Sequence, residues 1–134
     1  MAGPSVPRCI GAFTLVVDDY DEAIAFYTQA LGFELREDSP RENGKRWVLV
    51  APAGAETALL LARADGTQQA ARIGDQTGGR VGFFLHSDNF ARDHAAMIAR
   101  GVQFLETPRS EAYGTVAVFQ DLYGNRWDLL EPKS

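Results

Sequence analysis

The chain has 134 residues, 46% of them hydrophobic and 23% charged, which is the range of a single globular domain that needs neither disulfides nor a structural metal. Its 18 acidic residues outnumber 13 basic ones, and the net charge of -5 disfavours nucleic acid and anionic membrane surfaces as partners. No apolar run approaches the roughly 20 residues that a membrane-spanning helix needs.

The N-terminal segment and the cysteine content bear on where the protein works. The segment has neither a basic region nor a small-residue cleavage site, so it does not predict a signal peptide. Cys9 is the single cysteine of the chain, which excludes an intramolecular disulfide and fits a reducing compartment. We therefore expect a cytoplasmic location, with Cys9 as a small core residue rather than a nucleophile.

The first half of the chain predicts one strand, one helix and three further strands. Residues 10–17 are a continuous β-prone run, after which the hydrophobic period becomes helical. Asp19 and Glu22 form a capping-box-like entry to the helix, and Gly32 supplies a left-handed stop. The apolar stripe of this helix consists of Tyr20, Ile24, Tyr27 and Leu31. The strands that follow are expected over residues 33–37, 45–51 and 57–62, with a hairpin turn at Asn43-Gly44.

The second half repeats this order after a polar, glycine-rich linker. A strand over residues 81–86 leads into a helix that runs from the Asp88-Asn89 cap to Gly101. Three more strands are expected over residues 102–106, 115–120 and 126–131. The intervals Asp19–Gly32 and Asp88–Gly101 have the same length, which indicates an internal repeat.

This repeat predicts an α+β fold of two βαβββ modules. Because neither module can bury its sheet face alone, we expect the two sheets to form an open, barrel-like cup with a helix on the back of each sheet. A ferredoxin-like βαββαβ domain fits less well, since three strand-like segments follow each helix. The expected single domain spans residues 1–134, with module 1 at 8–63, a linker at 64–79 and module 2 at 80–132.

Strand alternation predicts which side chains line the cup, which is the candidate binding site. On the first strand, the side chains expected under the helix are Phe13, Leu15 and Val17, and those expected in the cup are Ala12, Thr14 and Val16. On the fifth strand, one face carries Gly82, Phe84 and His86. On the last strand, one face carries Arg126, Asp128 and Leu130. The polar candidates therefore come from the second module.

Two stretches of the chain resemble a known family. They are VDDYDEAIAFYTQALGF in the first module and ARGVQFLETPRSEAYGTVAVFQDLYGNRWDLLEP in the second. Both are similar to the vicinal oxygen chelate superfamily, which includes glyoxalase I, the bleomycin-resistance proteins and the extradiol dioxygenases. The resemblance covers nearly the whole chain and implies the same fold. It departs at Leu122, where the family commonly has proline in the turn before Gly-Asn.

The resemblance also implies where a metal would bind. In metal-dependent members, His or Gln, Glu, His and Glu on the first, fourth, fifth and eighth strands hold a divalent ion. The corresponding positions here are Ala12, Leu60, Gly82 (or Arg80, if the strand has a bulge) and Asp128. A zinc site needs three or four protein donors, and Asp128 alone can donate. We therefore expect no cofactor. A divalent Zn, Ni or Fe ion belongs to an alternative in which Asp128 and His86 join an unorthodox ligand set.

Six side chains are candidate ligand contacts, namely Asp128, His86, Phe84, Arg126, Trp47 and Tyr113. Asp128 either accepts a hydrogen bond from a cationic or hydrogen-bond-donating guest or is held by Arg126 or by backbone. His86 either forms an acid–base pair with Asp128 or lies at the strand end, where it caps the next helix or meets solvent. An aromatic residue at strand spacing is equally compatible with a place in the core. No catalytic residue is assigned.

The expected function is binding of a small molecule in the cup without a metal, as the resemblance to bleomycin-resistance proteins implies. The same resemblance implies a homodimer, because the family usually pairs modules or chains. The alternative is a metal-dependent lyase, isomerase or dioxygenase of the same superfamily, similar to lactoylglutathione lyase. A third reading is a dimeric module whose cup is filled by its own side chains and which acts through its surface.

Overall fold

The first module forms a four-stranded sheet, sheet A, in the order β1-β4-β3-β2. The computed structural model describes residues 7–134. Residues 1–6, which are part of the segment that does not predict a signal peptide, lie outside the described residues. Strand β1 (Ala12–Val17) pairs in parallel with β4 (Ala58–Arg63), and the antiparallel strands β3 (Arg46–Ala51) and β2 (Glu34–Pro40) complete the sheet. The turn η2 (Glu42–Gly44) joins β2 to β3, which confirms the predicted hairpin.

The helix of the first module begins and ends where the sequence predicts. Helix α1 (Tyr20–Ala25) continues into the π-helical turn η1 (Phe26–Ala30). Asp19 caps it by accepting a hydrogen bond from the Glu22 N–H at 2.8 Å. Gly32 has a φ of 74°, the left-handed conformation that ends a helix at low cost for glycine. Tyr20 and Tyr27 of the predicted stripe are buried.

The second module forms a five-stranded sheet, sheet B, with an interrupted edge. Its elements are β5 (Val81–His86), α3 (Phe90–Ala99), β6 (Gln103–Phe104), β7 (Arg109–Glu111), β8 (Gly114–Gln120) and β9 (Arg126–Pro132). The order is β5-β9-β8-β6, and β7 also pairs with β8. The strand predicted over residues 102–106 is thus wrong in extent. It shrinks to β6, and its continuation β7 resumes only after Pro108, which has no N–H to donate to a ladder.

The linker is anchored to the first strand. It contains the short helix α2 (Thr67–Ala70) and a two-way contact from Gln76. The N–H of Val16 donates to the Gln76 Oε1 at 3.2 Å, and the Gln76 Nε2 donates back to the Val16 carbonyl at 3.2 Å. Gly74 lies against the Tyr123 carbonyl, so close that an added Cβ would be 2.1 Å from the oxygen. The linker therefore bridges β1 and the β8–β9 turn.

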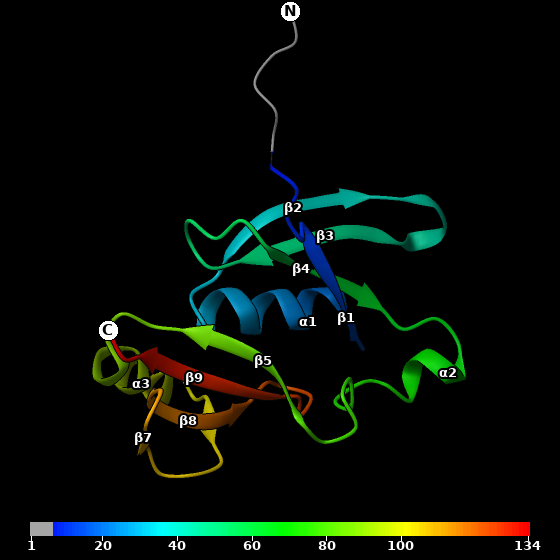
Figure 1. Ribbon diagram of the computed structural model, residues 1–134. Coiled ribbons are helices and arrows are strands. Elements are labelled where there is room, and N and C mark those ends of the chain that lie inside the picture. Colours follow the sequence, from blue (N-terminus) through cyan, green and yellow to red (C-terminus); the bar gives the residue numbers. More distant parts are fainter. Residues whose placement is uncertain (1–6) are drawn as a thin grey trace, which may run out of the picture.

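Helix α1 lies between the two sheets (Figure 1). In η1, which continues α1, the centroid of the Tyr27 ring is 5.9 Å from that of Trp127 of β9, and one buried cluster contains apolar side chains of both sheets. The fold class is confirmed as α+β with two sheets and no closed barrel. Because the helix-bearing faces bury each other, the helix-free face of each sheet, which we call its outer face, points away from the other sheet. The two outer faces do not enclose a cup within one chain.

Two expectations about individual side chains are wrong. Leu15 and Val17 are buried under α1 as expected, but Phe13 is 51% exposed, because it lines an open groove that no other side chain fills. Cys9 is exposed rather than part of the core, since it precedes the first residue that pairs in the sheet. None of the helices in residues 7–134 is long and apolar enough to cross a membrane.

A buried carboxylate joins the two modules. The Tyr27 hydroxyl donates to the Asp121 Oδ2 at 2.6 Å, and the Asn125 Nδ2 donates to the same oxygen at 2.8 Å. The N–H groups of Tyr123 and Asn125 each donate to the Asp121 Oδ1 at 2.9 Å. Burial, and then the Asp121 charge, raise the pKa of Tyr27 well above its usual value, so the hydroxyl keeps its proton.

We expect Tyr27→Phe to lower the free energy of unfolding by about 2 kcal/mol, because it removes a hydrogen bond to a buried charge. Urea denaturation followed by tryptophan fluorescence measures this change. Tyr123→Phe is the matched control, since that hydroxyl is partly exposed and makes only long contacts to Asp19 at 3.3 and 3.4 Å. Its cost should stay below about 0.5 kcal/mol. Equal costs for the two variants would contradict the assigned role of Tyr27.

Candidate functional site

The outer face of sheet B gathers four of the six candidate residues. In the strand pairing, Phe84 of β5 lies beside Asp128 of β9, and Asp128 lies beside Val118 of β8. His86 and Arg126 lie on the same face. Each is two residues along its strand from Phe84 or Asp128, on opposite sides of that pair. Trp127 and Leu129 alternate to the other face and enter the core.

Asp128 is a buried carboxylate with spare hydrogen-bonding capacity. Its side chain belongs to a residue that is 8% exposed, and its Oδ1 has no hydrogen-bond partner among the described residues. Burial raises the pKa of this carboxyl, Arg109 nearby lowers it, and the charge of Glu106 raises it further. A buried acceptor without a partner costs free energy, so its presence needs an explanation beyond packing.

The loop between β6 and β8 supplies charged neighbours that the sequence analysis missed. Glu106 accepts hydrogen bonds from the Val118 N–H at 2.9 Å and from the Arg109 Nε at 3.1 Å. Because Val118 pairs with Asp128 across the ladder, Glu106 is brought next to Asp128. Arg109 also donates to Glu111 at 3.0 Å and to Tyr113 at 3.4 Å. Only the interruption of the strand at Pro108 could have hinted at this loop.

The alternatives for His86, Arg126 and Asp128 are resolved by their contacts. His86 is exposed at the end of β5, and Asn89, not His86, caps α3 through the Arg92 N–H at 3.1 Å. Within residues 7–134, neither His86 nor Arg126 forms a hydrogen bond or ion pair with Asp128. The residues that the structure describes therefore leave the Asp128 Oδ1 without a hydrogen-bond donor.

An open groove of about 380 Å³ adjoins this face between the edge strands β1 and β5. Its walls include Phe13, Pro52, Thr57, Phe84, Leu85 and His86. Phe84 is 60% exposed and belongs both to the groove and to the outer face of sheet B. A groove of this size, with mostly apolar walls and a few polar groups, suits an organic molecule.

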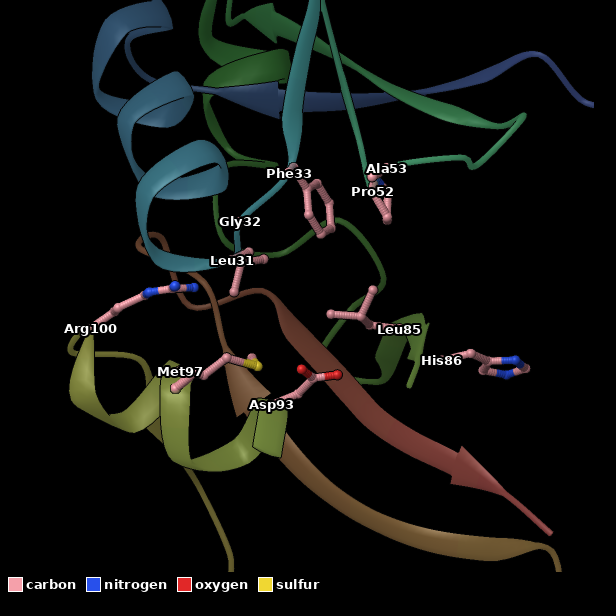
Figure 2. A pocket seen from close by; sticks show the side chains of 11 residues that line it. Leu31, Gly32, Phe33, Pro52, Ala53, Leu85, His86, Asp93, Met97 and Arg100 are labelled. Carbon is pink, nitrogen blue, oxygen red and sulfur yellow. The ribbon is translucent and has the colours of Figure 1, made fainter. Parts of the chain in front are cut away.

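A smaller cavity of about 170 Å³ lies between the modules beside α3 (Figure 2). The Asp93 carboxylate points into it, whereas the His86 ring points away from the other labelled side chains. Asp93 is already engaged, because it accepts hydrogen bonds from Arg92 and from the Ser87 hydroxyl. The Arg92 hydrogen bonds lower its pKa the most. This carboxylate therefore serves the start of α3 and offers no free acceptor.

The other two candidates lie apart from Asp128. Trp47 is on β3 of sheet A, 39% exposed, with the Arg41 guanidinium 5.7 Å from its ring centroid. Tyr113 precedes β8 and reaches the Asp128 neighbourhood only through its hydrogen bond from Arg109. Within one chain, the six candidates thus divide between the two sheets.

The residues at the family's metal positions do not fit a metal. The side chains of Ala12, Leu60 and Gly82 contain no donor atom, and the register places a bulge near Gly82 without bringing a ligand in its stead. Asp128 is the one donor of the set. No group of three or more His, Cys, Asp or Glu side chains with metal-binding geometry occurs in the described part of the chain. A zinc site needs at least three protein donors.

Comparison with known proteins agrees with this fold. A protein of Shewanella frigidimarina (strain NCIMB 400), described as uncharacterized, is 54% identical over 119 residues, which are 87% of this chain and 88% of that protein. The crystal structure of UcmS2 has a TM-score of 0.81 and 31% identity, covering 94% of this chain and 99% of UcmS2. TnmS3, an antibiotic binding protein from Streptomyces sp. CB03234, has a TM-score of 0.77 and 30% identity, covering 97% of this chain and all of TnmS3.

The family assignment rests on sequence as well as structure. The profile of the Glyoxalase/Bleomycin resistance protein/Dioxygenase superfamily matches residues 9–129, and so spans both modules and the linker. The two sheets, each with a helix after its first strand, agree with this match. The chain belongs to the glyoxalase/bleomycin resistance protein/dioxygenase superfamily.

Proposed function

We propose that this protein binds a small organic molecule, without a metal ion, on the outer face of sheet B. Asp128 accepts a hydrogen bond from a cationic or donor group of the guest, and Phe84 supplies an apolar contact. The observation that carries the proposal is the buried Asp128 carboxylate with its unpartnered Oδ1 beside an aromatic ring that is 60% exposed. Asp128, Glu106 and Glu111 carry three negative charges against the two positive charges of Arg109 and Arg126, so the neighbourhood favours a cation.

The similarity to TnmS3 supports the choice of ligand class. TnmS3 is described as an antibiotic binding protein, so antibiotics, and cationic ones in particular, are the first guests to test. The metal-dependent lyase, isomerase or dioxygenase alternative has weaker support, because three of the four family positions lack a donor atom. We propose that binding takes place in the cytoplasm, which the single exposed cysteine supports.

We further propose that two copies pair to complete the site. The outer faces point away from each other within one chain, so a cup requires the outer face of sheet A from one copy and that of sheet B from another. The exposed Phe84 and Trp47, one on each outer face, support such a contact. Exposed apolar groups of this size mark interaction surfaces when they cluster.

We expect Asp128→Asn to stabilise the ligand-free protein by about 1 kcal/mol at about pH 7, because an amide has no charge to desolvate. Burial raises the Asp128 pKa above the usual 3.8, so the folded state holds the proton more tightly than the unfolded chain does. The protonated carboxyl therefore contributes to the free energy of unfolding. This contribution is complete below pH 3.8 and is lost as the pH rises through the folded-state pKa. The gain in melting temperature should therefore shrink in acid. Wild type melting above the variant at neutral pH would contradict this.

The same variant should lose ligand affinity while it gains stability. A panel of cationic antibiotics that begins with bleomycin is screened by thermal shift, since a guest that binds only the folded state raises the melting temperature. Calorimetry should then show that Asp128→Asn weakens binding by about tenfold or more, the value of one hydrogen bond to a charged group. EDTA should leave binding unchanged. The matched control is Asp75→Asn, which makes the same substitution in a linker residue whose carboxylate already has a partner in Arg72.

Two results would overturn the proposed function. One is binding of the guest with equal affinity by wild type and Asp128→Asn. The other is loss of binding in EDTA with recovery on adding a divalent ion, which would favour the metal-dependent alternative.

Pairing of chains is tested by sedimentation equilibrium. We expect a species of twice the 14.7 kDa chain mass, and Phe84→Asp should weaken the association because it places a charge in the contact. The matched control is Ile98→Asp, which changes an equally exposed apolar residue on α3, away from both outer faces. A monomer in the wild type, or equal weakening by the two variants, would contradict the proposed pair.

A further inference from the structure

Sheet A opens at one end where β3 and β4 separate. These strands pair from Val50–Leu59 to Val48–Leu61 and no further. Beyond that point β3 stays paired with β2, and β4 stays paired with β1. The separation leaves a pocket of about 410 Å³, which we call the Arg63 pocket; it adjoins α2. Within one chain it lies on the other sheet from Asp128, and its Trp47 stands on the outer face of sheet A that the proposed pair of copies would use.

Tyr20 fills the base of the Arg63 pocket and orders two guanidinium groups. Its hydroxyl accepts a hydrogen bond from the Arg46 N–H at 3.1 Å, on the edge of β3 that has lost its strand partner. The guanidinium carbons of Arg46 and Arg63 are 5.1 and 5.3 Å from the centroid of its ring. A guanidinium held against an aromatic face is preordered, so it loses little conformational freedom when it binds an anion.

Charge is distributed unevenly in this pocket. Its lining contains four basic side chains, Arg41, Lys45, Arg46 and Arg63, and one acid, Asp65, in a chain whose net charge is -5. Three of the four are paired with carboxylates outside or at the rim: Arg46 with Asp21 and Asp38, Lys45 with Asp65, and Arg41 with Glu37. These pairs leave Arg63 as the basic group to examine.

Arg63 has no carboxylate within 4.0 Å among the residues that the structure describes. Within residues 7–134, its guanidinium donates one hydrogen bond, to the Gly44 carbonyl at 3.3 Å. A guanidinium has five N–H donors in a planar fork that matches a carboxylate, so most of its donors are unused. The rest of the wall is apolar and includes Trp47, Leu60 and Ala62.

We propose that the Arg63 pocket binds a small organic anion, with its carboxylate on Arg63 and its apolar body against Trp47 and Leu60. The free guanidinium supplies the charge recognition, and the exposed indole supplies a flat apolar surface. This is a second binding site with chemistry opposite to that at Asp128, which favours a cation.

The test uses 2-naphthoate as probe and naphthalene-2-carboxamide as its neutral counterpart, both titrated into the full-length protein by calorimetry. We expect naphthoate to bind about tenfold or more tightly than the carboxamide, the value of a charge-assisted hydrogen bond. This comparison uses wild-type protein and is independent of any variant's folding. Binding should also quench tryptophan fluorescence, because Trp47 lines the pocket.

Variants then locate the site. Arg63→Gln should weaken naphthoate binding by about tenfold or more, and Arg63→Lys should retain part of the affinity because it keeps the charge. Arg72→Gln is the matched control, since it makes the same charge change in an exposed linker residue outside the pocket. Asp128→Asn should leave naphthoate affinity unchanged, which separates this proposal from the proposed function. Equal affinity for the two probes, or equal effects of Arg63→Gln and Arg72→Gln, would overturn it.

Discussion

The two modules are held in their relative position by the hydrogen bond between the Tyr27 hydroxyl and the Asp121 carboxylate. This bond links the helix of one module to the β8–β9 turn of the other. Within the turn, the backbone N–H and the side-chain amide of Asn125 also donate hydrogen bonds to the carboxylate. Because both partners are buried, the geometry is fixed, and Tyr27 and Trp127 can pack ring against ring. Together with the shared apolar core, this contact sets how the outer face of sheet B lies relative to sheet A.

Three carboxylates of the chain differ in whether their hydrogen bonds are satisfied by the protein itself. Asp121 is saturated by donors from its own chain, Asp93 is engaged by Arg92 and Ser87, and Asp128 keeps one oxygen without a partner. Asp121 and Asp128 are both buried, so the number of hydrogen-bond donors, not burial, distinguishes these two. A protein that retains an unpaired buried carboxylate forgoes stability, which is common at positions selected for binding.

Local signals in the sequence predict the elements well, and long-range contacts limit the rest. The Asp19 and Asn89 caps, the Gly32 stop and the Asn-Gly turn each depend on a few neighbouring residues and are confirmed. Alternation correctly separates Asp128 from the buried Trp127. The roles of Glu106, Arg109 and Phe13 depend on an interrupted edge strand and on the way the modules pack. The alternation of side chains along a strand predicts neither of these. The same reason explains why an exposed Cys9 was expected in the core.

The contact between Gln76 and Val16 gives the linker a protective role. Strand β1 is an edge strand, and a bare edge is a template on which a second molecule can add a strand, the first step toward fibrils. The Gln76 amide imitates one residue of a neighbouring strand and occupies that position from within the chain. Shortening the linker before Gln76 would remove this contact and leave that position of β1 open to strand addition.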